Sequence, residues 1–207
     1  MKTTRLLICA VAFAAAVSST RVNGQTLASR FEGISLGAQL QGTWTNGEGI
    51  HSPPVGISSF SDFDAFCVEP TQGIEPGQEV IYQIQDPTSL TNYDRIARLI
   101  GAFLASSRSA ADAAAVQWAI WESTSEFLLE PSLADGSVRL IGGAPELETI
   151  GLANEFLNNA PKFEPVTLTY LRNDQYQDMV SWNVIPEPSS LGLAVLSGLL
   201  LFRRRRN

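Results

Sequence analysis

One cysteine and one glutamine in this chain have side chains and surroundings that together could form an acyl bond. Cys67 lies in the segment 66–69, which has the pattern of a short strand, and Gln117 lies in the segment 115–122, which has helical spacing. Gln117 borders the apolar face of that helix, because its neighbours one turn away are apolar. A thiolate that attacks a side-chain carboxamide expels ammonia and leaves an internal thioester, which reacts with amines or hydroxyls. If the strand packs on the helix, the two residues predict this chemistry.

Large apolar side chains surround both candidates in the sequence. They are expected to form a pocket that keeps water away from a thioester. The pocket-packing residues predicted in this way are Phe66, Trp118, Ile120 and Trp121.

The same two segments resemble the thioester domains of Gram-positive adhesins. In that family a cysteine after an aromatic residue links to a glutamine in a helix motif of the type Thr-Gln-x-x-Ile-Trp. The resemblance carries Cys67 and Gln117 across as thioester partners, with Ile120 and Trp121 in the packing positions. This sequence has Val116 where the family often has threonine.

Two other roles for Cys67 remain open on the sequence. Cysteine often serves as a small buried hydrophobic residue, and Cys67 would then be structural. Cys9 falls in the predicted signal peptide, so Cys67 is the single cysteine of the mature chain. A free thiol in a secreted protein is also a candidate for pairing between molecules.

Other chemistry has little support in the sequence. His51 is the single histidine and lies in a Gly/Pro-rich loop, so we expect it to be solvated and to belong to no triad or zinc cluster. Asp62, Asp64 and Glu69 lack the spacing of a calcium-binding loop and are expected to form a solvated acidic edge. We therefore predict no enzyme activity, no metal and no cofactor.

Two alternative functions are kept beside the thioester. A secreted carbohydrate-binding module would use tryptophan rings as stacking platforms, with at least two rings exposed in one groove. The rings available are Trp44, Trp118, Trp121 and Trp182. A secreted hydrolase would need two carboxylates that converge in a cleft with perturbed pKa values.

The elements that must position these residues form a mixed pattern. Strands are predicted at 31–45, 64–69, 79–84, 166–170 and 178–184, with a loop rich in Gly, Ser and Pro at 46–61. Helices are predicted at 93–104, at 110–123 with Ser109 as N-cap, and at 146–158. The third has one apolar side, formed by Leu147, Ile150, Ala153 and Leu157. This order predicts one α+β domain, an antiparallel sheet, sandwich or barrel with an inserted group of about three helices.

The first 24 residues have the features of a secretory signal peptide. Lys2 and Arg5 precede a run of 12 mostly apolar residues from Leu6 to Val17. At 1.5 Å per residue, this run is too short to cross a bilayer core of roughly 30 Å. We predict cleavage by signal peptidase before Gln25, leaving a secreted domain at 25–184.

The last 23 residues, 185–207, carry three features in fixed order: the motif Pro186-Glu187-Pro188, a short apolar helix at 191–202, and Arg203, Arg204, Arg205 and Arg206. The arginines mark the cytoplasmic side of a membrane. The segment resembles the PEP-CTERM sorting signal of Gram-negative bacteria. The resemblance implies transient membrane anchoring, processing by an exosortase, and export of the mature protein to the cell surface or an exopolysaccharide matrix. A plain C-terminal anchor is the alternative.

The charge distribution restricts the partners. The formal net charge is −7, but half of the 14 basic side chains lie in the two terminal segments. Residues 25–185 hold 20 acidic and seven basic side chains, a formal charge of −13. Because phosphate binding needs clustered Lys and Arg, we predict no nucleic-acid partner. Exopolysaccharide or another surface ligand is the expected partner class.

Overall fold

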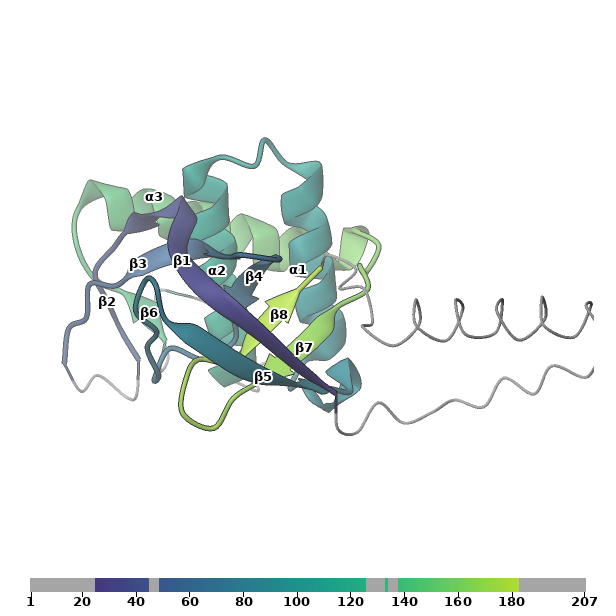
Figure 1. Ribbon diagram of the computed structural model, residues 1–207. Coiled ribbons are helices and arrows are strands. Elements are labelled where there is room, and N and C mark those ends of the chain that lie inside the picture. Colours follow the sequence, from purple (N-terminus) through teal and green to yellow (C-terminus); the bar gives the residue numbers. More distant parts are fainter. Residues whose placement is uncertain (1–24, 45–48, 126–132, 134–137, 183–207) are drawn as a thin grey trace, which may run out of the picture.

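A computed structural model describes residues 25–44, 49–125, 133 and 138–182 (Figure 1). The predicted signal peptide and the predicted sorting segment, with its Pro186-Glu187-Pro188 motif and Arg203–Arg206, lie outside the described residues. The described chain forms an α+β fold, which confirms the predicted class.

Six antiparallel strands close into a barrel. In barrel order they are β1 (Thr26–Gln39), β3 (Pro54–Phe60), β4 (Asp64–Cys67), β8 (Met179–Ser181), β7 (Thr169–Arg172) and β5 (Glu79–Gln85), which pairs again with β1. A separate two-stranded sheet joins β2 (Gly42–Thr43) to β6 (Arg139–Leu140). The strand predicted at 79–84 is confirmed as β5, in which Val80 and Tyr82 are buried while the residues between and beside them are exposed.

The helices lie between β5 and β7 in the sequence, as predicted, and sit together behind the strands in Figure 1. They are α1 (Tyr93–Ala105), α2 (Ala110–Ser125) and α3 (Ala144–Asn159), with short 3-10 turns η1 (Pro87–Ser89) and η2 (Ala160–Lys162). α2 contacts α1, α3, β1, β3 and β4, so it is the element that joins the helices to the barrel.

The position of α2 follows from its sequence. Ser109 and Asp112 cap its first turn reciprocally: the amide of Asp112 donates to Ser109 Oγ and the amide of Ser109 donates to Asp112 Oδ2, both at 3.1 Å. This confirms the predicted N-cap. Every side chain from Asp112 to Ser123 is buried. A helix of small and apolar residues that is buried on all sides holds its polar side chains in the interior.

Two predictions about elements were wrong. The loop predicted at 46–61 contains β3, because its Gly and Ser residues allow β1 to approach closely while Val55, Ile57 and Phe60 fill the core. Leu147 was predicted on the apolar side of the third helix and is 65% exposed. α3 instead turns Glu146 inward, where its carboxylate accepts a hydrogen bond from the amide of Gln41.

Gly56 is expected to be intolerant of any side chain. Its φ is +142°, and a Cβ there would overlap the Leu36 carbonyl oxygen and come within 2.6 Å of the Gly37 Cα. We expect Gly56→Ala to lower the free energy of unfolding by more than about 2 kcal/mol in chemical denaturation. Gly73→Ala, where a Cβ meets nothing within 4 Å, is the matched control. Equal stability of the two variants would contradict the close β1–β3 approach.

Candidate functional site

The side-chain amide of Gln117 lies directly against the backbone of Cys67. The Cys67 N–H donates to Gln117 Oε1 at 3.0 Å, and Gln117 Nε2 donates to the Cys67 carbonyl oxygen at 2.7 Å. Gln117 is 1% exposed and Cys67 is 3% exposed. The structure therefore brings together the two residues that the sequence analysis paired, in the predicted arrangement of a strand against a helix.

The end of a strand ladder explains why a side chain fits here. β3 and β4 pair only at Ser58–Ala65 and Ser59–Asp64, while β4 continues to pair with β8 as far as Cys67 and Met179. The backbone N–H and C=O of Cys67, which face away from β8, thus have no neighbouring strand to pair with. Gln117 supplies one acceptor and one donor in place of that neighbour, which satisfies both buried backbone groups.

The thiol of Cys67 is held in its protonated form. Burial raises its pKa to about 12, and a weaker interaction with the Trp121 side chain acts in the opposite direction. The thiol donates to the carbonyl oxygen of Glu69 at 2.7 Å. A thiol in this state is a poor nucleophile toward molecules in solvent.

The predicted packing residues divide between the two faces of β4. Trp121 lines the same cavity as Cys67 and Gln117. Phe66 points to the opposite face, as alternation along a strand requires, and packs on Phe103 and Trp182. Of the remaining two, Trp118 packs edge-on against Trp121 at 5.1 Å, and Ile120 is fully buried.

A cavity of about 550 Å³ reaches the Cys67–Gln117 contact. Trp44 and His51 lie in its wall, with their rings stacked 4.2 Å apart. His51 is exposed, as predicted, and its backbone pairs with Gly42. This cavity has the size of a typical small-ligand site and gives an approach to two residues that are otherwise buried.

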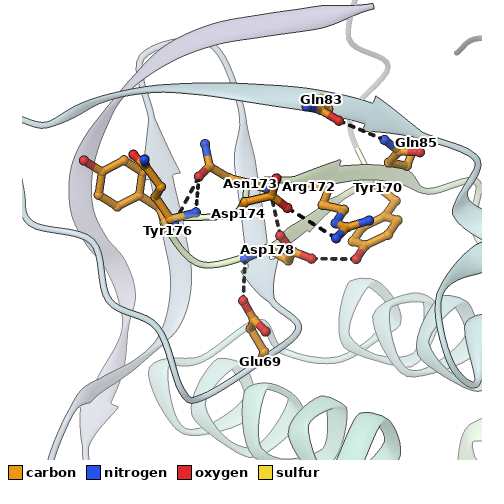
Figure 2. A network of polar contacts seen from close by, with 10 residues as sticks. Glu69, Gln83, Gln85, Tyr170, Arg172, Asn173, Asp174, Tyr176 and Asp178 are labelled. Atoms are coloured by element: carbon orange, nitrogen blue, oxygen red, sulfur yellow. Dashed lines mark hydrogen bonds and ion pairs between the residues drawn. The ribbon is translucent and has the colours of Figure 1, made fainter. Parts of the chain in front are cut away.

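A second cavity of about 420 Å³ contains a carboxylate pair that the sequence analysis did not identify (Figure 2). The hydroxyl of Tyr170 donates to Asp178 Oδ2 at 2.6 Å, and the amide of Asn173 donates to Asp178 Oδ1 at 2.7 Å. The amide of Asp178 approaches Glu69 Oε1 at 3.5 Å. Burial and the charge of Asp178 raise the pKa of the Glu69 carboxyl.

The acidic edge predicted from Asp62, Asp64 and Glu69 does not exist as a unit. Asp62 accepts hydrogen bonds from Ser29 and Ser61, whereas Asp64 accepts one from Ser59. Glu69 faces Asp178 instead. In the part of the chain that the structure describes, no three His, Cys, Asp or Glu side chains are grouped to hold a metal ion.

The four tryptophans do not form an exposed pair in one groove. Trp118 is fully buried, Trp121 is 3% exposed, and Trp44 and Trp182 are half-buried. Trp182 packs on Phe66 and Phe103 on the other face of β4. Only Trp44 combines partial exposure with a position in the described walls of the cavities.

In comparisons with known proteins, no family model, curated protein or solved structure matches the chain. Among the described residues, no helix has the length and apolar character that crossing a membrane requires.

The raised pKa of Glu69 predicts a pH-dependent effect on stability. The fold favours the protonated carboxyl, so this contribution to stability is present below the ordinary glutamate pKa of about 4.3 and is lost as pH rises through the higher folded pKa. Glu69→Gln should therefore have a higher Tm than the unsubstituted protein at pH 7 and the same Tm near pH 4. Glu75→Gln, at an exposed glutamate, should match the unsubstituted protein at both pH values. A stability difference that does not change with pH would contradict the assignment.

Proposed function

We propose that this chain is an exported cell-envelope or matrix protein that attaches covalently to a surface molecule through an internal thioester between Cys67 and Gln117. The observation that carries the proposal is the pair of hydrogen bonds that hold the Gln117 carboxamide on Cys67. The Gln117 carbon Cδ is bonded to both Oε1 and Nε2, the two atoms that make these hydrogen bonds. Cδ is therefore held beside Cys67, the residue that bears the thiol.

The hydrogen bonds suit the formation of the thioester. Attack of Sγ on Cδ develops negative charge on Gln117 Oε1, and the Cys67 N–H already donates to that oxygen in the manner of an oxyanion hole. The Sγ–Cδ bond forms, the Cδ–Nε2 bond breaks, and the thiol proton leaves with the nitrogen as ammonia. The reaction requires no oxidant, metal or co-reactant.

Burial has opposite effects on forming and keeping the bond. The raised pKa of the Cys67 thiol slows the first attack, since little thiolate exists at neutral pH. The same burial keeps water from the finished thioester. The bond is therefore expected to form slowly inside the folded domain and to last until a stronger nucleophile enters the cavity.

Export and sorting complete the proposal. The signal-peptide features at 1–24 and the resemblance of 185–207 to a PEP-CTERM signal support passage through the inner membrane and release by an exosortase. The acidic body of the chain supports a location outside the cell rather than on nucleic acid or anionic lipid.

A hydrolase at the Glu69–Asp178 pair has less support. Both carboxylate oxygens of Asp178 accept hydrogen bonds, from Tyr170 and from Asn173, which gives this carboxylate a structural role between β7 and β8. A purely structural role of Gln117 uses the same two hydrogen bonds, and the mass of the protein separates it from the thioester.

The thioester predicts a loss of about 17 Da, the mass of ammonia, from the protein. Methylamine should then add about 31 Da to the thioester form of the intact protein, which leaves the Gln117 side chain about 14 Da heavier than unmodified glutamine and releases the Cys67 thiol for alkylation in the denatured protein. Mass spectrometry of the intact chain and of the peptides that contain Gln117 measures both changes.

Cys67→Ala and Gln117→Ala should each abolish methylamine incorporation. Gln177→Ala, at another glutamine of the same cavity, should incorporate methylamine as the unsubstituted protein does. A circular dichroism spectrum establishes that each variant is folded. An unmodified mass together with no incorporation of methylamine would overturn the thioester and leave Gln117 as a structural residue.

Sorting has its own test in a bacterial host that contains an exosortase. Glu187→Ala should keep the C-terminal segment and remain in the membrane fraction, because the processing motif is broken. Glu164→Ala, an exposed acid in the domain, should be released as the unsubstituted protein is. Recovery of released protein that still carries Arg203–Arg206 would contradict the proposal.

A further inference from the structure

The two cavities beside Cys67 are adjacent. The cavity of about 550 Å³ that reaches Gln117 and the cavity of about 420 Å³ that contains Glu69 and Asp178 share three wall residues, namely Trp44, Pro70 and Thr71. Together they are called the acceptor groove below. We propose, on the basis of the thioester function above, that this groove binds a polymer of amino sugars, whose amine attacks the Gln117 acyl group.

The charge of the acceptor groove favours a cation. Its described wall contains the carboxylates of Glu69, Glu75 and Asp178, and no Lys or Arg is among its described wall residues. Arg172 acts on Glu69 electrostatically but pairs with Asp174 outside the wall. With a body of formal charge −13, this wall attracts ammonium groups and repels phosphate, sulfate and uronate polymers.

The neutral groups of the wall favour a sugar rather than a simple amine. Aromatic surface comes from Trp44, backed by His51 at 4.2 Å and by Trp121 at 5.7 Å. Residues with hydroxyl groups line the same wall, among them Ser52, Thr71, Thr91 and Ser125. A wall that combines aromatic, hydroxyl-bearing and acidic residues is suited to the C–H faces and hydroxyls of a sugar chain.

Two buried polar atoms lie in the wall of the groove. Gln72 Oε1 is an acceptor and Trp121 Nε1 is a donor, and neither has a nitrogen or oxygen partner among the described residues. Trp121 is 97% buried, and its side chain makes a hydrogen bond to the Cys67 sulfur. The Trp121 donor therefore pairs with the reacting sulfur, and Gln72 Oε1 is the buried acceptor left for a ligand amine or hydroxyl.

The reaction balances with the groups present. The lone pair of the sugar nitrogen attacks Cδ of Gln117, the new C–N bond forms, and the Cδ–Sγ bond breaks with its electron pair on Sγ. The indole N–H of Trp121 stabilises the leaving thiolate, which then takes the proton from the sugar nitrogen. The products are an amide at Gln117 and a free thiol at Cys67.

An amine on a sugar ring is better suited to this site than lysine. The lysine amine has a pKa of about 10.4 and is almost entirely protonated at neutral pH. The ring oxygen and hydroxyls of a 2-amino sugar withdraw electrons and lower its basicity. A larger share is therefore the free base that attacks a thioester, while the remaining ammonium groups of the polymer bind the carboxylates.

The test compares five acceptors at equal concentration of reactive groups: a glucosamine hexamer, its N-acetylated form, glucosamine monomer, a lysine-containing peptide and methylamine. Incorporation at Gln117 is followed by peptide mass spectrometry on the unsubstituted protein. We expect the glucosamine hexamer to react at least about tenfold faster than the lysine peptide and the N-acetylated hexamer to give no covalent product. Glucosamine monomer should react more slowly than the hexamer, because it spans one part of the groove.

Variants separate the groove from the acyl bond. Glu69→Gln and Trp44→Ala should each lower the ratio of hexamer rate to methylamine rate by about tenfold, whereas the distant Glu164→Gln should leave the ratio unchanged. Trp121→Phe keeps the ring and removes the donor, so it should slow acyl transfer to every amine, with Trp118→Phe as the matched control.

The outcomes distinguish the two proposals. If the protein incorporates no amine at all and has an unmodified mass, the thioester function and the acceptor proposal both fail. If methylamine is incorporated but the hexamer reacts no faster than the lysine peptide or the glucosamine monomer, the thioester stands and the amino-sugar acceptor is overturned.

Discussion

The contact between the Gln117 carboxamide and the Cys67 backbone is the constraint on which the rest of the structure depends. It closes the unpaired end of the β3–β4 ladder and ties the fully buried helix α2 to the barrel wall. Thr124, about two turns further along α2 than Gln117, donates to the Val68 carbonyl and fixes the same alignment. Loss of the amide would leave a buried N–H and a buried C=O unpaired, at a cost of about 1–3 kcal/mol each.

Stability and reactivity compete at this contact. A carboxamide that only filled the ladder would need no cavity beside it. Here the amide is held by Cys67, the thiol is protonated by burial, and a cavity reaches both. The burial that stabilises this contact is the same burial that lowers the reactivity of the thiol toward molecules in solvent.

Local patterns predicted much of the fold. Capping by Ser109, the alternation in β5 and the spacing of α1 and α2 are readable because each depends on a few neighbouring residues. β3 was missed because Pro54, Gly56 and two serines make it resemble a loop, and only its pairing with β1 makes it a strand. Leu147 was misplaced because the buried role of Glu146 depends on Gln41, 105 residues away in the sequence.

The same distinction separates the parts of the candidate site. Cys67 and Gln117 were predicted because a polar amide on the apolar side of a helix is visible in the sequence. Glu69 and Asp178 were not paired, because they are 109 residues apart and meet only where β4 and β8 become neighbours. Trp44 and the cavities depend on the packing of several loops, for which no short pattern exists.

The closed barrel has a consequence for assembly. Each of its six strands pairs with a neighbour on both sides, so the barrel presents no free strand to another molecule. Copies of the domain crowded together at high concentration therefore cannot polymerise by adding a strand to this barrel. Such copies remain dispersed unless their side chains or loops make the contact.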